Sequence, residues 1–301
     1  MAGALRTLSR PARAAVIASL VALVVAGTGA GAAGRLASTA SRAPGPASTA
    51  RPAASSPSRA VTVAARRLGA KRRKASPWPP PLERASPAHP ITILEVGDSL
   101  GEDLGIGLSA LLAGDRSVHL LPEAVGSTGL AALWYYDWPV ELASELDRYH
   151  PQLVIVMLGG NDAQSFDVGS EYVGFGTPLW RRVYGERVAT MMREATSAGA
   201  HVLWVGMPIM SPTSVLSNSS MQLENDVYSS EARQHPGVAF MSTWRLFANA
   251  EGQYAEYLPD AKGQLVQVRD PDGVHIDIPG GTDLVAGAVL RELDRLWHLG
   301  I

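Results

Sequence analysis

Short apolar runs alternate with amphipathic segments along residues 91–301 of the chain. Five of these runs predict buried β-strands, at residues 91–96, 117–121, 153–158, 201–205 and 238–241. Apolar positions at helical spacing predict helices at residues 99–112, 139–149, 179–198, 220–234 and 281–299. Strands that alternate with helices of this length predict a parallel sheet covered by helices on both faces. The pattern therefore indicates an α/β fold, with residues 91–301 as one domain.

The N-terminal residues show a different pattern. Residues 14–26 form an apolar run that follows Arg6, Arg10 and Arg13 and precedes a stretch of small residues. This arrangement is typical of a secretory signal. Extended to residues 14–33, the run also reaches the length of a weakly hydrophobic membrane tether. We therefore expect residues 1–34 to be a signal peptide or an N-terminal membrane anchor, and the protein to be exported, either secreted or anchored at the cell envelope.

Residues 35–90 consist mainly of Ala, Pro, Ser, Thr and Arg, with few large apolar side chains. Such a segment cannot bury enough apolar surface to offset the entropy of ordering the chain. We therefore expect a disordered, basic linker over this range, which separates the N-terminal segment from the folded domain.

Charge also divides the chain. Its 301 residues contain 26 Lys and Arg against 28 Asp and Glu, but residues 1–90 hold 14 basic residues and one acid, whereas residues 91–301 hold 12 basic and 27 acidic residues. A domain this acidic is not expected to bind nucleic acid. The absence of cysteine excludes disulfides, thiolate metal sites and a cysteine nucleophile. The histidines show no metal-ligand spacing, so we expect neither a metal nor a cofactor.

Ligand crevices in parallel sheets lie beyond the carboxyl ends of the strands, so the residues that follow each predicted strand are the first candidates for a site. Gly97-Asp98-Ser99 follows the first strand. A serine at a strand-to-helix turn holds its hydroxyl in the crevice beside helix N–H groups, which is a suitable position for a nucleophile. Alternatively, Asp98 or Ser99 only caps the helix.

A second candidate segment, Gly159-Gly160-Asn161-Asp162, follows the third predicted strand. The two glycines allow the backbone to approach the site closely, and an asparagine amide can donate to a developing oxyanion. The alternative is a simple turn in which the asparagine tolerates left-handed geometry.

A third candidate segment precedes the last predicted helix and contains Asp270, Asp272 and His275. The imidazole can take a proton from serine, and an acid three residues earlier can hold its tautomer. Spacing favours Asp272, and Asp270 is its competitor. A surface histidine in a turn is one alternative. A calcium loop is another, but Gly281 stands where that loop needs a glutamate, so we discount it.

Taken together and in this order, the three segments resemble the motifs of the SGNH/GDSL hydrolase family. The resemblance spans residues 91–301, and Gly126, after the second predicted strand, fits the family's second motif less specifically. It implies a three-layer α/β/α sandwich with a central, mostly parallel sheet of about five strands, the flavodoxin-like SGNH hydrolase fold. It also implies a serine hydrolase that acts on ester bonds.

The family's residue roles carry over by matching position. The resemblance implies that Ser99 is the nucleophile, His275 the general base and Asp272 its orienting carboxylate. It also implies an oxyanion hole formed by the backbone N–H groups of Ser99 and Gly126 and the side chain of Asn161. We expect the remaining motif residues to support the loops: Gly97, Asp98, Gly159 and Asp162.

An exported, acidic domain on a basic linker suggests work at the cell envelope. Within the family, that setting is associated with O-acetyl groups on polysaccharide or peptidoglycan. We therefore predict an esterase that removes a small acyl group, O-acetyl in particular, from an acylated small molecule or envelope glycan. Acyl transfer by the same triad and a catalytically silent envelope-binding module stay open as alternatives. The cluster Trp134, Tyr135, Tyr136 and Trp138 either stacks on sugar rings or packs inside the domain.

Overall fold

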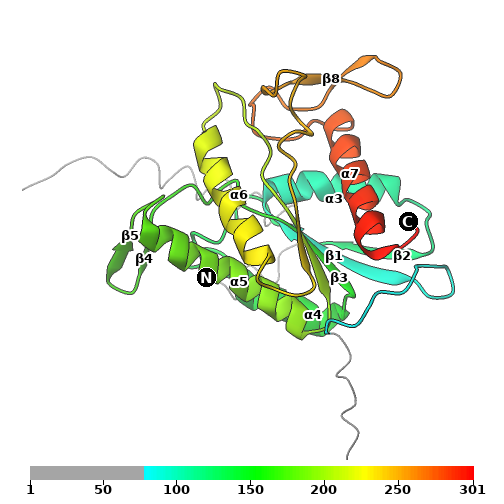
Figure 1. The fold of residues 1–301 in the computed structure, drawn as a ribbon, viewed down its shortest axis with the longest axis horizontal. Coiled ribbons are helices and arrows are strands. Elements are labelled where there is room, and N and C mark those ends of the chain that lie inside the picture. Colours follow the sequence, from blue (N-terminus) through cyan, green and yellow to red (C-terminus); the bar gives the residue numbers. More distant parts are fainter. Residues whose placement is uncertain (1–77) are drawn as a thin grey trace, which may run out of the picture. The chain divides into compact units, whose positions relative to one another are not determined.

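The computed structural model describes residues 78–301 (Figure 1). The predictions for residues 1–34, and for most of the linker, lie outside the described residues. No helix within the described range is long and apolar enough to cross a membrane.

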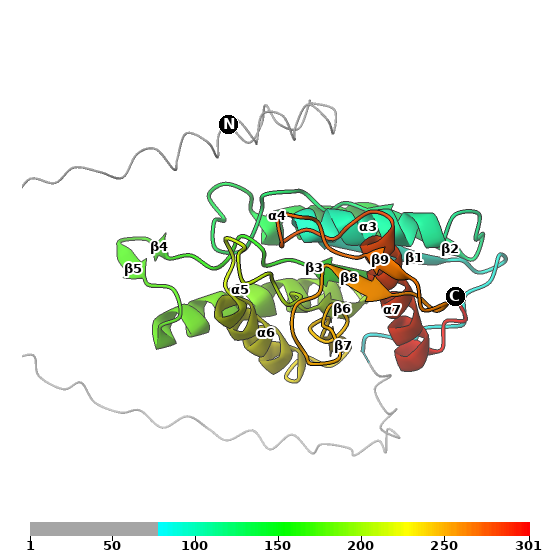
Figure 2. The ribbon, with the colours of Figure 1, turned by 90° about the horizontal axis from the view of Figure 1, so that it is seen from above.

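A five-stranded parallel sheet, in the order β2-β1-β3-β6-β7, forms the centre of the domain (Figures 1 and 2). Its strands are β1 (Ile91–Gly97), β2 (Val118–Pro122), β3 (Leu153–Met157), β6 (His201–Val205) and β7 (Val238–Met241). Every residue of β3 and β6 is buried, which agrees with a sheet covered on both faces.

Five helices cover the sheet in two groups. They are α3 (Ser99–Leu111), α4 (Trp138–Tyr149), α5 (Pro178–Ser197), α6 (Asn218–Ala232) and α7 (Gly280–Trp297). Helix α3 packs against α7, whereas α5 packs between α4 and α6, and the sheet lies between these two groups (Figure 1). This is a three-layer α/β/α sandwich, so the predicted fold class is confirmed.

Helices α3 to α6 are each preceded by a polar residue whose side chain accepts a backbone N–H of the first turn. These N-cap residues are Asp98, Asp137, Thr177 and Ser217. Such side chains satisfy N–H groups that have no partner within the helix, and they set the residue at which the helix starts. Helix α3 consequently begins at Ser99, immediately after the end of β1.

The register of the sheet brings the ends of β1 and β3 together. Gly97, the last residue of β1, pairs with Met157, the last residue of β3. A Cβ on Gly97 would lie 2.0 Å from the Met157 carbonyl oxygen, so only glycine fits here. The segments that follow the two strands therefore leave the sheet side by side.

Two small hairpins were not predicted from the sequence. One pairs β4 (Phe166–Val168) with β5 (Glu171–Val173), and the other pairs β8 (Tyr257–Pro259) with β9 (Leu265–Gln267). Their strands are three residues long and mostly exposed or half-buried, so they lack the apolar runs that identify the central strands.

The last part of the predicted linker, residues 78–90, is packed against the domain, which corrects the expectation of disorder up to residue 90. The Trp78 indole N–H donates to the Thr196 carbonyl at 2.6 Å, and the Pro80 carbonyl lies 2.9 Å from His201 Nε2. Further along, the Ala85 N–H donates to a backbone carbonyl near the C-terminus. The composition of the segment did not indicate this packing, because one tryptophan and a few backbone groups are enough to hold a short segment against the surface of a folded domain.

Candidate active site

Ser99 and His275 lie together although 176 residues separate them in the chain. The Ser99 Oγ and His275 Nε2 atoms are 2.9 Å apart, which is hydrogen-bond distance. Ser99 starts α3 directly after β1, and His275 belongs to the loop before α7, the helix that packs against α3. The packing of these two helices therefore brings the hydroxyl and the imidazole together.

Asp272 contacts the other side of the imidazole. Its Oδ2 lies 2.5 Å from His275 Nδ1, and its Oδ1 accepts the backbone N–H groups of Val274 and His275 at 2.8 and 3.0 Å. Burial raises the pKa of Asp272, but the hydrogen bonds from His275 and Val274 outweigh it, so the net pKa is lowered. Asp272 is therefore ionised at neutral pH and can hold Nδ1 protonated, which leaves Nε2 facing Ser99 as an acceptor.

The basicity of His275 reflects the carboxylates around it. Burial lowers its pKa, but the hydrogen bond and charge of Asp272, with the charges of Asp103 and Asp270, raise it above the ordinary value. Asp270 acts only through its charge, because its backbone, and not its carboxylate, bonds to the loop. Of the two acids considered from the sequence, Asp272 is the one that contacts the ring.

The predicted oxyanion donors are only partly available. Asn161 donates one amide N–H to the Thr128 carbonyl at 2.9 Å, which fixes the side chain and leaves its second N–H for a ligand. Gly126 has a single N–H, and it donates to Glu102 Oε1 at 3.0 Å. Ser99, as the first residue of α3, carries one of the N–H groups that have no partner within the helix. A role for Gly126 thus requires the Glu102 carboxylate to move away.

Asp98 joins the serine turn to the asparagine loop. Its Oδ1 accepts the Leu100 N–H at 2.9 Å, and its Oδ2 accepts the N–H groups of Gly159 and Gly160 at 2.9 and 2.6 Å. Burial raises the pKa of Asp98 to about 6, although the three backbone hydrogen bonds oppose that shift. A Cβ on Gly159 would lie 2.3 Å from the Tyr228 hydroxyl, so the loop also needs a glycine at this position.

Asp162 holds the neighbouring loop, which follows Gly126, through its buried carboxylate. Its carboxylate accepts the Leu130 and Ala131 N–H groups at 3.0 and 2.7 Å and the Tyr184 hydroxyl at 2.7 Å. Burial raises the pKa of Asp162 above its ordinary value, although these donors oppose that shift. Tyr184 Oη in turn lies 2.8 Å from Tyr228 Oη. The two loops that carry the predicted donors are thus held by two buried carboxylates.

The buried layer beneath these loops was not predicted as part of the site. Tyr184 and Tyr228 come from α5 and α6, and Glu224 lies one turn before Tyr228. Burial raises the pKa of Glu224 well above its ordinary range, and the charges of Asp162 and Asp98 add to this effect. In the sequence these three residues only occupy positions of amphipathic helices, so nothing there indicated a shared network.

Arg269, which sequence reasoning also missed, holds the loop that carries His275. Its guanidinium is fully buried and donates to the carbonyls of Val274 at 2.6 Å, His275 at 3.2 Å and Ile209. Burial lowers the pKa of Arg269 to about 10, so it stays charged. Because it reaches carbonyls of two different loops, Arg269 fixes the histidine loop against the segment after β6.

The aromatic cluster divides between the interior and the surface. Trp138 is buried, and its indole N–H donates to Thr128 Oγ1 at 2.9 Å. Trp134 is 82% exposed and lies edge-on to Tyr135. Packing therefore accounts for Trp138, and Trp134 is the member of the cluster that is free to contact a ligand.

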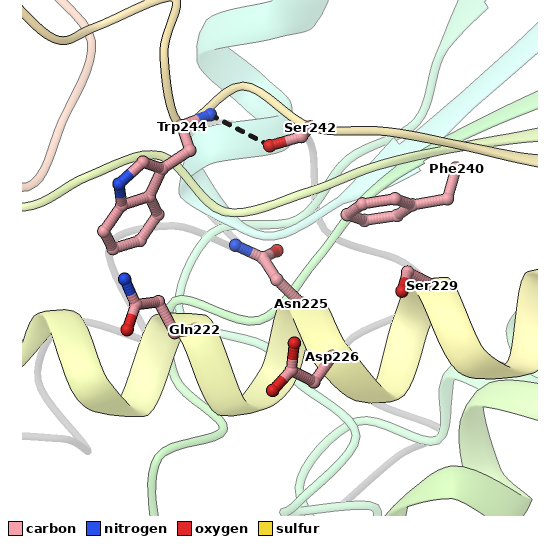
Figure 3. A pocket seen from close by; sticks show the side chains of 7 residues that line it. All are labelled: Gln222, Asn225, Asp226, Ser229, Phe240, Ser242 and Trp244. Carbon is pink, nitrogen blue, oxygen red and sulfur yellow. Dashed lines mark hydrogen bonds between the residues drawn. The ribbon is translucent and has the colours of Figure 1, made fainter. Parts of the chain in front are cut away.

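An open groove of about 360 Å³ lies between α6 and the end of β7 (Figure 3). The residues that line it are Gln222, Asn225, Asp226, Ser229, Phe240, Ser242 and Trp244. Asn225 is engaged in holding the backbone, because its amide exchanges two hydrogen bonds with Met207, at 2.8 and 2.9 Å. The groove includes none of the site residues predicted from the sequence.

Within residues 78–301, no group of three His, Asp or Glu side chains is arranged to hold a metal ion.

Several solved structures are similar to the chain at low sequence identity. The chain is similar to a GDSL-like lipase from Bacteroides thetaiotaomicron, with 13% identity, a TM-score of 0.46 and coverage of 71% of this chain and 93% of that one. It is also similar to the psychrotrophic esterase EstA from Pseudoalteromonas sp., with 14% identity, a TM-score of 0.45 and coverage of 67% and 98%. A carbohydrate esterase family 3 protein from Talaromyces cellulolyticus matches with 16% identity, a TM-score of 0.46 and coverage of 69% and 98%.

No curated protein matches the sequence significantly. One family model does match, over residues 92–292, and its description is "Protein of unknown function (DUF459)". Since this match covers more than half of the chain, the protein belongs to the DUF459 family.

Proposed function

We propose that this protein is a serine hydrolase that cleaves ester bonds. The observation that carries the proposal is the contact series from Asp272 to His275 to Ser99, at 2.5 and 2.9 Å. Serine is a poor nucleophile until a base removes its proton, and an imidazole at hydrogen-bond distance, itself held by a carboxylate, is suited to that task. Ser99 and His275 are both partly accessible, so a substrate can reach them.

In the proposed reaction, Ser99 Oγ attacks the ester carbonyl carbon while His275 Nε2 accepts the hydroxyl proton. The tetrahedral intermediate carries its negative charge on the former carbonyl oxygen, which the Ser99 N–H and the free N–H of the Asn161 amide stabilise. Collapse of the intermediate breaks the bond to the alcohol oxygen, and that oxygen takes the proton from His275. Water then attacks the acyl-enzyme by the same route, which releases the carboxylic acid and restores Ser99.

For the substrate, we propose a small acyl ester, O-acetyl in particular, on a polysaccharide or peptidoglycan of the cell envelope. The N-terminal sequence supports export, since it combines basic residues, an apolar run and small residues. The exposed Trp134 supports a carbohydrate, because an aromatic face can pack against a sugar ring. Replacement of Trp134 by Ala should therefore reduce acetate release from an acetylated glycan and spare hydrolysis of a small acetyl ester.

The test of the hydrolase proposal uses the full chain and a generic chromogenic acetyl ester. We expect turnover by the wild type, loss of turnover in Ser99→Ala, and one phosphonate adduct on Ser99 after treatment with a serine-directed phosphonate. Ser109→Ala is the matched control, because Ser109 is an exposed serine on the same helix. Turnover in Ser99→Ala at the wild-type rate would exclude the covalent mechanism.

A catalytically silent binding module is the competing function, and one observation favours it. The N–H of Gly126, one of three predicted oxyanion donors, is occupied by the carboxylate of Glu102. Complete inertness of the wild type towards esters and phosphonates would support this module. If the protein is active, its products distinguish hydrolysis from acyl transfer. Release of acetate indicates hydrolysis, whereas an acetylated sugar formed from an added acceptor glycan indicates acyl transfer.

A further inference from the structure

Asp103 is a partly buried acid on α3, to which the sequence analysis gave no role. It follows Ser99 by four residues, and residues four apart lie on the same face of a helix. Asp103 therefore lies one turn along α3 from the serine hydroxyl, on the side from which the histidine loop approaches.

The Asp103 carboxylate is bonded to that loop. Its Oδ2 accepts the backbone N–H of Ile276 at 3.0 Å, across 173 residues of sequence. Ile276 follows His275 directly, and its side chain is buried. Asp272 thus holds the imidazole ring, whereas Asp103 holds the backbone next to it and ties this backbone to the helix that begins with Ser99.

Asp103 also interacts with the imidazole electrostatically. Its negative charge is one of the contributions that raise the pKa of His275, after those of Asp272. A carboxylate that is close to the ring but not bonded to it stabilises the imidazolium without fixing the tautomer. In the proposed reaction, the imidazolium forms at the moment when Ser99 transfers its proton.

We propose that Asp103 is a positioning residue for His275: it ties the histidine loop to the helix that carries Ser99, and its charge stabilises the protonated imidazole during turnover. This inference rests on the proposed function, because it assigns a part of the same reaction. It adds a second carboxylate, from a different element, to the Asp272–His275–Ser99 series.

The charged groups that face Asp103 are Glu102 on its own helix, and Asp270, Arg269 and His275 on the loop opposite. Burial raises the pKa of Asp103 to about 6; the Ile276 N–H and the His275 charge oppose this, and the charges of Asp270 and Glu102 add to it. Asp103 is therefore largely ionised at pH 8. Loss of its negative charge should change activity most at and above neutral pH.

Two substitutions separate the charge from the tether. Asp103→Asn keeps an oxygen that can accept the Ile276 N–H but removes the charge, whereas Asp103→Ala removes both. For Asp103→Asn we expect the apparent pKa of kcat/KM to fall by roughly one unit, the lower end of the effect of a neighbouring charge. The matching loss in kcat at pH 8 is roughly tenfold, and Asp103→Ala should lose more. Asp147→Asn, at an exposed acid on α4, is the control for a charge change alone.

A second readout does not depend on turnover. The His275 ring is titrated by NMR in the full-length wild type and in Asp103→Asn, with His275→Gln to assign the signal, and its pKa should fall in the variant. If the wild type proves inactive but this pKa still falls, the hydrolase proposal fails and the coupling between Asp103 and His275 stands. If Asp103→Asn does not fold, Asp103→Glu should retain more activity than Asp103→Ala. A wild-type ring pKa together with a wild-type pH profile in Asp103→Asn would overturn the inference.

Discussion

The Asp98 carboxylate accepts the Gly160 N–H at 2.6 Å and thereby joins the turn before Ser99 to the loop before Asn161. These two segments follow neighbouring strands, β1 and β3, whose last residues are paired. One buried side chain therefore sets the distance between the predicted nucleophile and a predicted oxyanion donor. Asp98 therefore has two roles: it caps α3, and it holds the loop that carries Asn161.

Replacing Asp98 by Asn should impair both stability and activity. The amide keeps one oxygen but puts an N–H₂ group against backbone N–H groups of Gly159, Gly160 or Leu100, which leaves at least one buried donor unpaired. We expect a loss of about 1–3 kcal/mol in the free energy of unfolding, measured by urea denaturation, and a lower kcat from the displaced loop. Wild-type values of both quantities in this variant would contradict the bracing role.

The Asn161 amide gives a direct prediction about catalysis. Asn161→Ala should lower kcat by roughly 10²–10³, as removal of one oxyanion donor does in other enzymes, with little change in KM. Gln234→Ala serves as the control, because the Gln234 amide is exposed and donates to the Ser230 carbonyl, outside the candidate site. A loss confined to KM would show that Asn161 binds substrate without stabilising the intermediate.

Glu102 should restrain the reaction if Gly126 takes part in it. In Glu102→Ala, the Gly126 N–H is released from the carboxylate, and a negative charge near the developing oxyanion is removed. We expect kcat/KM for a neutral acetyl ester to rise several-fold, with the rise abolished by adding Asn161→Ala. A fall in kcat/KM would instead mean that Glu102 holds the Gly126 loop in its productive position.

The tyrosine pair beneath the loops predicts a stability change with a matched control. Tyr184→Phe removes the hydroxyl that donates to Asp162, so a buried carboxylate loses one of its donors. The free energy of unfolding should fall by about 1–2 kcal/mol. Tyr172→Phe, at a hydroxyl-bearing side chain that is 69% exposed, should leave stability unchanged. Equal stability of the two variants would show that the Asp162 contact adds nothing.

Stability should fall as the pH rises from about 4.5 to 7.5. Burial raises the pKa of Asp98 and Asp103 to about 6 and that of Glu194 to about 7, so each binds its proton more tightly in the folded state. Their contribution is complete below the ordinary carboxyl pKa and is lost as the pH rises through the folded values. The raised pKa of His275 acts in the same direction. The lowered pKa of Asp272 acts oppositely, but only in acid below its ordinary value.

Urea denaturation at several pH values measures this trend. The whole shift of Asp98 corresponds to about 3 kcal/mol as an upper bound. Glu194→Gln should flatten the upper part of the curve, between pH 6 and 7.5, since it removes the group with the highest of these values. A free energy of unfolding that is constant or increases with pH would contradict the prediction.

The central fold could be predicted because each interior strand carries its own signal. Residues 153–158 and 202–205 are continuous apolar runs, and the structure places β3 and β6 there, buried throughout. The β8–β9 hairpin has no such signal, because its three-residue strands are stabilised by their pairing and not by burial. Sequence periodicity therefore identifies the strands that form the interior of the domain and misses short strands at its surface.

The candidate site was predictable to the extent that its residues follow strand ends. Ser99 and Asn161 stand directly after β1 and in the loop after β3, and the parallel topology brings such segments together. Arg269 and Asp103 have no comparable signal, because each bonds to a segment that is distant in the sequence: Arg269 donates to the Ile209 carbonyl, and Asp103 accepts the Ile276 N–H. Arg269 bonds to backbone carbonyls, which every residue carries, so no acidic partner in the sequence could indicate that this arginine is buried.

The attachment of residues 78–90 determines where the rest of the chain joins the domain. Trp78 and Pro80 contact Thr196 and His201, just before and at the beginning of β6, whereas Ser99 lies past the opposite, carboxyl end of the sheet. Trp78, the first residue that the structure describes, therefore contacts the domain at the end of the sheet that is remote from the serine.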